Sequence, residues 1–179
     1  SSPSMEEARR RLELEGEAPV LGLLPGSRVG EITRHLPILL RSIRHLTVEQ
    51  PGLRVIIAVA GGLPLGLIES CLDQEAITAR VVQGRTYEVM AASDLILVAS
   101  GTATLEAAII GTPMVIVYRL AFLSWLLGRV LIRVPYVGMV NLVAGRRVVP
   151  ELIQFHATPE RIADEARRLL LSTEQRLRM

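Results

Sequence analysis

Lysine is absent from this chain, and all 20 of its basic residues are arginines. A phosphate-binding loop of the P-loop type needs a lysine after its glycines, so that class of nucleotide site is excluded. The single cysteine, Cys71, excludes an internal disulfide and a zinc site built from cysteines. A net charge of only +2 gives no broad positive field. We therefore expect no nucleic-acid partner.

Long apolar runs and aromatic residues are also scarce. No stretch approaches the roughly 18 uninterrupted apolar residues that a membrane-spanning helix needs. The polar, charged segment 1–11 does not resemble a signal peptide. Aromatic residues make up 3% of the chain and hydrophobic residues 50%, so the core must be aliphatic. This balance favours a parallel sheet covered by helices on both faces.

The signatures of common cofactor sites are missing as well. The fingerprint G-x-G-x-x-G does not occur, which argues against a nicotinamide or flavin enzyme. The three histidines, His35, His45 and His156, are too scattered for a metal cluster. We expect no cofactor and no metal.

What the chain does have is a regular alternation of apolar runs and helical stripes. Strands are predicted at 20–24, 53–60, 80–82, 94–98 and 113–118. Helices are predicted at 37–50, 64–74 and 86–92, and from about 103 to 110. Pro37 is expected in the first turn of its helix, where its missing N–H does no harm. The alternation predicts an α/β, Rossmann-like parallel sheet with helices on both faces.

One domain is expected over residues 1–179. It would consist of a leading helical segment at 1–18 and a core of sheet and helices at 19–118. The remainder, 119–179, reads as an apolar helix, a polar loop and a capped C-terminal helix.

Two loops stand out because open parallel sheets bind ligands beyond the carboxyl ends of their strands. In the first, Gly26 permits close backbone approach, Ser27 offers a hydroxyl and Arg28 a planar fork for phosphate oxygens. The same residues also fit a plain turn. The second loop, 100–104, presents three hydroxyls and free backbone N–H groups at a helix start, which attracts anions.

Glu106 follows the second loop, and its role has two interpretations. It can be a capping glutamate of the first helical turn, although position 103 holds Ala instead of the usual Ser or Thr partner. It can instead project into the cleft and accept hydrogen bonds from a ribose diol.

Three blocks of sequence, in this order, resemble lipid-A-disaccharide synthase. They are LLPGSR followed by Glu31, SGTATLEAAIIGTPMVIVY at 100–118 and NLVAGRRVVPELIQ at 141–154. The resemblance runs from about Val20 to about Leu170. It implies the C-terminal domain of an inverting, two-domain (GT-B type) glycosyltransferase. That family joins UDP-2,3-diacylglucosamine to 2,3-diacylglucosamine 1-phosphate, forming the lipid A disaccharide and UDP.

The resemblance also implies roles for particular residues. Glu106 would bind the ribose of UDP, while Ser100, Gly101 and Thr102 would face the diphosphate. Arg28 and Asn141 would point into the cleft and contact the leaving group or substrate. The other candidates for nucleotide binding are Gly26, Ser27, Thr104 and Gln154.

Only the C-terminal half of the family is matched. The resemblance implies that the family's N-terminal half carries the acceptor site and the general base. Because catalysis needs both, the chain by itself is expected to be inactive. The resemblance implies a cytoplasmic location, peripheral to the inner membrane of a Gram-negative bacterium. A homodimer is compatible with it.

The apolar segment 120–134 is expected to meet lipid or protein. One helical side would carry Phe122, Trp125, Arg129 and Arg133, which suits a membrane surface, and equally an interface with another domain or subunit.

Two other functions remain open at this point. The first is another UDP-sugar enzyme of the same architecture, such as a different glycosyltransferase or a UDP-N-acetylglucosamine 2-epimerase. The second is a non-catalytic nucleotide-binding module.

Overall fold

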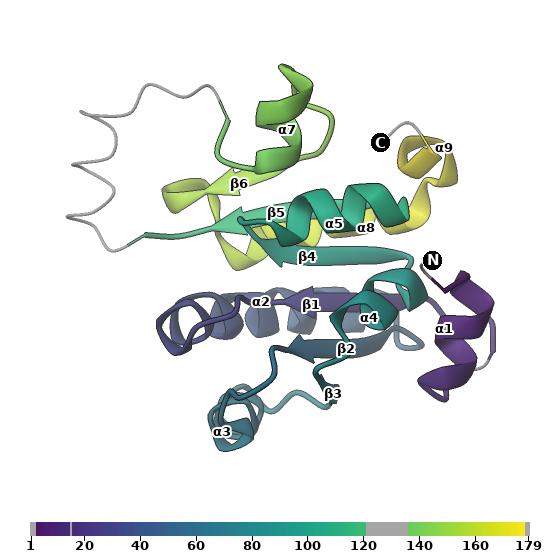
Figure 1. The fold of residues 1–179 in the computed structure, drawn as a ribbon. Coiled ribbons are helices and arrows are strands. Elements are labelled where there is room, and N and C mark those ends of the chain that lie inside the picture. The colour runs from purple at the N-terminus through teal and green to yellow at the C-terminus, as the bar shows by residue number, and fades with distance from the viewer. Residues whose placement is uncertain (1–2, 15, 121–135, 178–179) are drawn as a thin grey trace.

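The computed structural model describes residues 3–14, 16–120 and 136–177. Within these ranges six strands form one parallel sheet (Figure 1). The strands are β1 (Val20–Leu24), β2 (Arg54–Val59), β3 (Arg80–Gln83), β4 (Leu95–Ala99), β5 (Met114–Tyr118) and β6 (Glu151–Ile153).

Helices cover both faces of the sheet. The elements are α1 (Met5–Arg11), α2 (Val29–Glu49), α3 (Leu65–Glu75), α4 (Thr86–Ala92), α5 (Ala103–Ile110), α7 (Met139–Ala144), the short 3-10 helix η1 (Gln154–His156), α8 (Pro159–Leu171) and α9 (Thr173–Leu177). Helices α2, α3 and α8 bury their apolar sides against one face. Helices α1, α4, α5 and α7 do so against the other. The predicted α/β, Rossmann-like fold class is thus confirmed.

An apolar core lies on each face of the sheet, and each central strand contributes side chains to both cores because successive side chains point to opposite faces. Along β4, Leu95 and Leu97 belong to the core under α2 and α8, while Ile96 and Val98 belong to the core under α4 and α5. Both faces are covered, so the strand reads as a continuous apolar run with no polar positions.

The strand order is β3-β2-β1-β4-β5-β6. The chain therefore winds outward from β1 in one direction, then crosses to β4 and winds in the other. The direction of winding reverses between β1 and β4, because the chain leaves β1 for α2 on one face of the sheet and leaves β4 for α5 on the other. In open α/β sheets this switch point is where ligands bind.

Helix α2 begins earlier than predicted, which corrects the expected position of Pro37. The helix starts at Val29, so Pro37 lies in its interior. The early start has a local cause. The carboxylate of Glu31 accepts hydrogen bonds from the backbone N–H groups of Ser27 (2.8 Å) and Arg28 (3.3 Å), which stabilises the first turn.

The sheet also extends beyond the predicted core at 19–118, because β6 pairs with β5. Leu120 is not helical, and the rest of the segment expected to be an apolar helix, with Phe122, Trp125, Arg129 and Arg133, lies outside the described residues. Among the helices that are described, none is long and apolar enough to cross a membrane.

Candidate functional site

A cleft of about 540 Å³ opens at the carboxyl ends of β1, β2 and β4. This volume lies within the roughly 300–1,000 Å³ range of small-molecule sites. The cleft is lined by Leu24, Gly26, Ser27, Arg28, Glu31, Ala58, Ala60, Thr86, Tyr87, Ala99, Ser100, Gly101, Thr102, Ala103 and Glu106. Both loops singled out in the sequence therefore meet at the switch point of the sheet.

The loop after β1 is held in place by Glu31. Gly26 has a φ of +129°, and a Cβ on it would lie 2.5 Å from the Cβ of Glu31. Glycine is needed here because the Glu31 side chain packs directly over the turn. The Glu31 carboxylate accepts the backbone N–H groups of Ser27 and Arg28. The exposed Arg28 guanidinium makes no hydrogen bond or ion pair within the described residues, so it remains available to an anion.

The loop after β4 presents unpaired backbone donors. The N–H groups of Gly101, Thr102 and Ala103 make no hydrogen bond with any other described residue, and all three residues line the cleft. They stand at the start of α5, where the helix dipole adds positive potential. Ser100 also lines the cleft, but its hydroxyl donates to the carbonyl of Val137 at 2.9 Å. An oxyanion would therefore meet backbone donors first.

Glu106 reaches the cleft from the first turn of α5. Its carboxylate Oε1 accepts a hydrogen bond from the phenol of Tyr87 at 2.8 Å. Thr102, at the N-cap position, makes no side-chain cap, so no reciprocal capping box forms. The capping reading of Glu106 is thus excluded, and the carboxylate is presented to the cleft.

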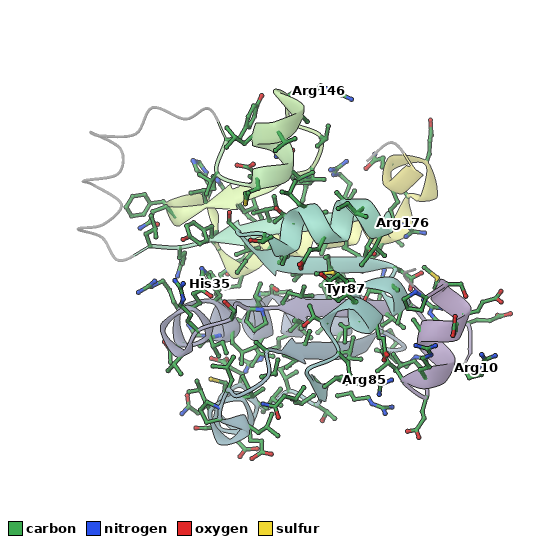
Figure 2. The ribbon with its side chains drawn as sticks, viewed as in Figure 1. Arg10, His35, Arg85, Tyr87, Arg146 and Arg176 are labelled. Atoms are coloured by element: carbon green, nitrogen blue, oxygen red, sulfur yellow. The ribbon has the colours of Figure 1, made fainter. Side chains whose placement is uncertain are left out.

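Tyr87 was not among the residues singled out from the sequence. It lies near the start of α4 (Figure 2) and is 51% exposed. It lines the cleft, where its hydroxyl contacts Glu106. The signal that could have found it is its place just after β3, at the same edge of the sheet as the two loops.

His35, which the sequence analysis considered only as a metal ligand, has a structural role beside the cleft. It is buried on α2, and its Nδ1 lies 3.2 Å from the carbonyl of Pro25 (Figure 2). Its Nε2 accepts the backbone N–H of Arg119 at 3.0 Å, which identifies the neutral ring with the proton on Nδ1. Burial lowers the pKa of His35. Through its two hydrogen bonds the ring connects the loop after β1 to the end of β5.

Two expected nucleotide ligands lie elsewhere, and the structure corrects them. Thr104 is fully buried, and its hydroxyl donates to the carbonyl of Gly101 at 2.8 Å. Gln154 bonds through both atoms of its amide to the backbone of Leu120, at 3.0 and 3.1 Å. Neither residue lines the cleft.

The largest correction concerns Asn141, which was expected to contact the leaving group. Its side chain is fully buried and does not line the cleft. Its Nδ2 donates to the carbonyl of Val149 and to Glu151, while its Oδ1 accepts the N–H groups of Val148 and Val149. The four bonds use the amide's full capacity, so none is left for a substrate.

Asn141 and Glu151 nevertheless affect the cleft indirectly, through the backbone that contacts Ser100. Glu151 accepts the backbone N–H groups of Val137 and Gly138, both at 3.0 Å. The carbonyl of Val137 in turn receives the hydroxyl of Ser100. We call Asn141 and Glu151 the 141–151 clip. It holds the backbone against which Ser100 rests.

The described residues form no group of three or more His, Cys, Asp or Glu side chains that could hold a metal ion. Among the described residues that line the cleft, the groups open to a ligand include three backbone donors, the Arg28 guanidinium and the Glu106 carboxylate with Tyr87 beside it. The second carboxylate of the lining, Glu31, accepts the N–H groups of its own loop. Donors and a cation suit a diphosphate, and a carboxylate suits a pair of hydroxyls.

Comparison with known proteins shows the family of this chain. The lipid-A-disaccharide synthetase family matches residues 1–179. The lipid-A-disaccharide synthase of Myxococcus xanthus is 47% identical over 161 residues, covering 90% of this chain and 42% of that protein. The synthase of Solibacter usitatus is 42% identical over 176 residues, covering 98% of this chain and 45% of that protein. The chain thus spans less than half the length of these curated relatives.

Solved structures share the fold at low sequence identity. WaaG, a glycosyltransferase involved in lipopolysaccharide biosynthesis, matches with a TM-score of 0.68 at 18% identity, over 99% of this chain and 44% of that one. The UDP-GlcNAc 2-epimerase from Neisseria meningitidis, bound to UDP-GlcNAc, matches with a TM-score of 0.65 at 14% identity, over 96% and 41%. At such identities the likeness concerns the fold alone.

Proposed function

Because this chain belongs to the lipid-A-disaccharide synthase family, we propose that its cleft holds the UDP moiety of a sugar donor. The donor would be UDP-2,3-diacylglucosamine and the acceptor 2,3-diacylglucosamine 1-phosphate, as the family resemblance implies. The observation that carries the proposal is that Glu106 and three N–H groups to which no described residue bonds meet in one cleft at the switch point.

The donor's diphosphate would lie at the start of α5. The N–H groups of Gly101, Thr102 and Ala103 suit its oxygens, and the helix dipole favours its charge. The guanidinium of Arg28, which comes from the loop on the other side of the switch point, would add a positive charge beside the diphosphate. Glu106 would accept hydrogen bonds from the ribose hydroxyls.

The reaction proposed for the longer protein is an inverting transfer. The acceptor's 6-hydroxyl oxygen forms a bond to the anomeric carbon while the bond from that carbon to UDP breaks. Negative charge develops on the departing UDP, and fixed N–H dipoles with Arg28 stabilise it without a metal. The hydroxyl proton passes to a base that we place outside this chain.

This division of labour makes the chain a donor-binding half. We propose that it binds UDP alone but turns over no substrate alone, because acceptor binding and proton removal need the other half. The strong sequence similarity to synthases, at 47% and 42% identity, favours this function over the epimerase alternative. The natural setting we propose is the cytoplasmic surface of the inner membrane.

Calorimetric titration of UDP into the purified chain tests the proposal. Replacing Glu106 by Ala removes the carboxylate, and we expect affinity to fall by about 10- to 100-fold, the range for hydrogen bonds to a charged group. Glu69→Ala is the matched control, since Glu69 is exposed on α3, away from the cleft. Its affinity should equal that of the parent. Undetectable binding by the parent, or equal binding by the Glu106 variant, would overturn the proposal.

A further inference from the structure

The contact between Tyr87 and Glu106 joins two helices across the cleft wall. Tyr87 comes from α4 and Glu106 from α5, 19 positions apart in the sequence, and their side chains meet at 2.8 Å. Both line the cleft, and Tyr87 is 51% exposed. Because Tyr87 is largely exposed, it adds little to the core, and the interaction that its hydroxyl makes is the bond to Glu106.

The geometry leaves Glu106 able to bind a ligand while Tyr87 stays in place. A carboxylate has about four acceptor positions on its two oxygens. The Tyr87 phenol occupies one of them, on Oε1. Oε2 makes no hydrogen bond within the described residues. Two neighbouring hydroxyls of a ligand can therefore bind the carboxylate without displacing the phenol.

Fixing the carboxylate in advance has a physical benefit. A free glutamate side chain loses rotamer freedom when a ligand immobilises it, and this loss weakens binding. The hydrogen bond from Tyr87 already restricts the side chain in the ligand-free protein. It also holds the carboxylate where it lines the cleft.

We propose that Tyr87 is a positioning residue for recognition of the ribose diol, and that it favours ribonucleoside over deoxyribonucleoside diphosphates. It acts through Glu106, by holding that carboxylate ready for both hydroxyls. The inference rests on the proposed function, because it assumes that the nucleotide's ribose lies against Glu106.

The ionisation of Tyr87 agrees with this role. The hydrogen bond to Glu106, and then the charge of that carboxylate, raise the pKa of the phenol, because a phenolate would face a negative group. Tyr87 therefore keeps its proton at neutral pH and remains a donor.

The test compares two probes on two proteins by calorimetry. The probes are UDP and 2′,3′-dideoxy-UDP, and the proteins are the parent chain and Tyr87→Phe, which keeps the ring and removes only the hydroxyl. We expect Tyr87→Phe to bind UDP about 3- to 10-fold more weakly, the range for immobilising one side chain. For the dideoxy probe the two proteins should agree within about twofold, because the diol that senses the positioning is missing.

A second pair of variants checks that Tyr87 acts through Glu106. In a Glu106→Ala background, the further change Tyr87→Phe should leave UDP affinity unchanged within about twofold. Circular dichroism melting should place Tyr87→Phe near the parent, because the ring and its packing remain.

Three results would overturn the inference. Tyr87→Phe could bind UDP as well as the parent, which would make the contact incidental. It could bind UDP more tightly, which would mean that the phenol competes with the ribose. It could lose the same factor for both probes, which would assign Tyr87 to another part of the nucleotide. In each case a parent that binds UDP in a Glu106-dependent manner leaves the proposed function standing, so the two failures are distinguishable.

Discussion

Replacing Asn141 by Ala separates the structural role of this residue from the role that its sequence motif implied. The change removes partners from the N–H and C=O of Val149, which is 2% exposed, and from the N–H of Val148. Leaving a buried polar group unsatisfied costs about 1–3 kcal/mol. With two such groups on Val149, we expect a loss of about 2–6 kcal/mol in the free energy of unfolding. The melting temperature should fall by at least about 4 °C.

Urea denaturation followed by circular dichroism measures this loss. Val143→Ala is the matched control, because Val143 lies on the same helix and is 73% exposed. Its free energy of unfolding should stay within about 0.5 kcal/mol of the parent. If Asn141→Ala were as stable as the parent yet bound UDP much more weakly, the reasoning would be refuted. Asn141 would then contact the substrate, as the motif suggested.

The remaining predictions concern pH and lipid. Burial lowers the pKa of His35 from its ordinary 6.5, so the unfolded chain takes up this proton first and stability should decline as the pH falls below 6.5. His35→Gln should flatten the urea-measured slope by up to about 1.4 kcal/mol per pH unit, and an unchanged slope would contradict the burial argument. For the segment outside the described residues, replacing Phe122 and Trp125 by Ser should weaken co-sedimentation with vesicles. Also replacing Arg129 and Arg133 should weaken it further on anionic lipid. A parent chain that stays in the supernatant at every lipid composition would remove this idea.

Strands β1, β2, β4 and β5 were predictable because each is an apolar run bounded by Gly, Pro or polar residues, and β3 because two adjacent valines form its centre. Strand β6 was missed because it lacks such a run. It has only three residues, and its first, Glu151, is a charged residue of the 141–151 clip. The start of α2 was also missed, because it depends on how the Glu31 side chain folds back over Gly26. Such a contact is not visible in a periodic pattern.

The two loops of the site were predictable from their places after strands, but individual side chains were not. Thr104 and Ala107 are three residues apart on α5 and both are buried, so the helical period already places Thr104 toward the core. For Asn141 no local signal exists. Its partners at 148–151 come close only when the chain turns back after α7. The residue type alone fits a ligand contact and a buried clip equally well.

The central claim is that UDP binds at the switch point, against the start of α5. An NMR titration of the ¹⁵N-labelled chain with UDP tests this most directly, because each backbone N–H reports separately. We predict that the largest chemical-shift changes fall on Gly101, Thr102 and Ala103, with Glu106 and Tyr87 next. Changes confined to another hollow, such as the groove between α2 and α8 lined by His45 and Asp164, would contradict the claim.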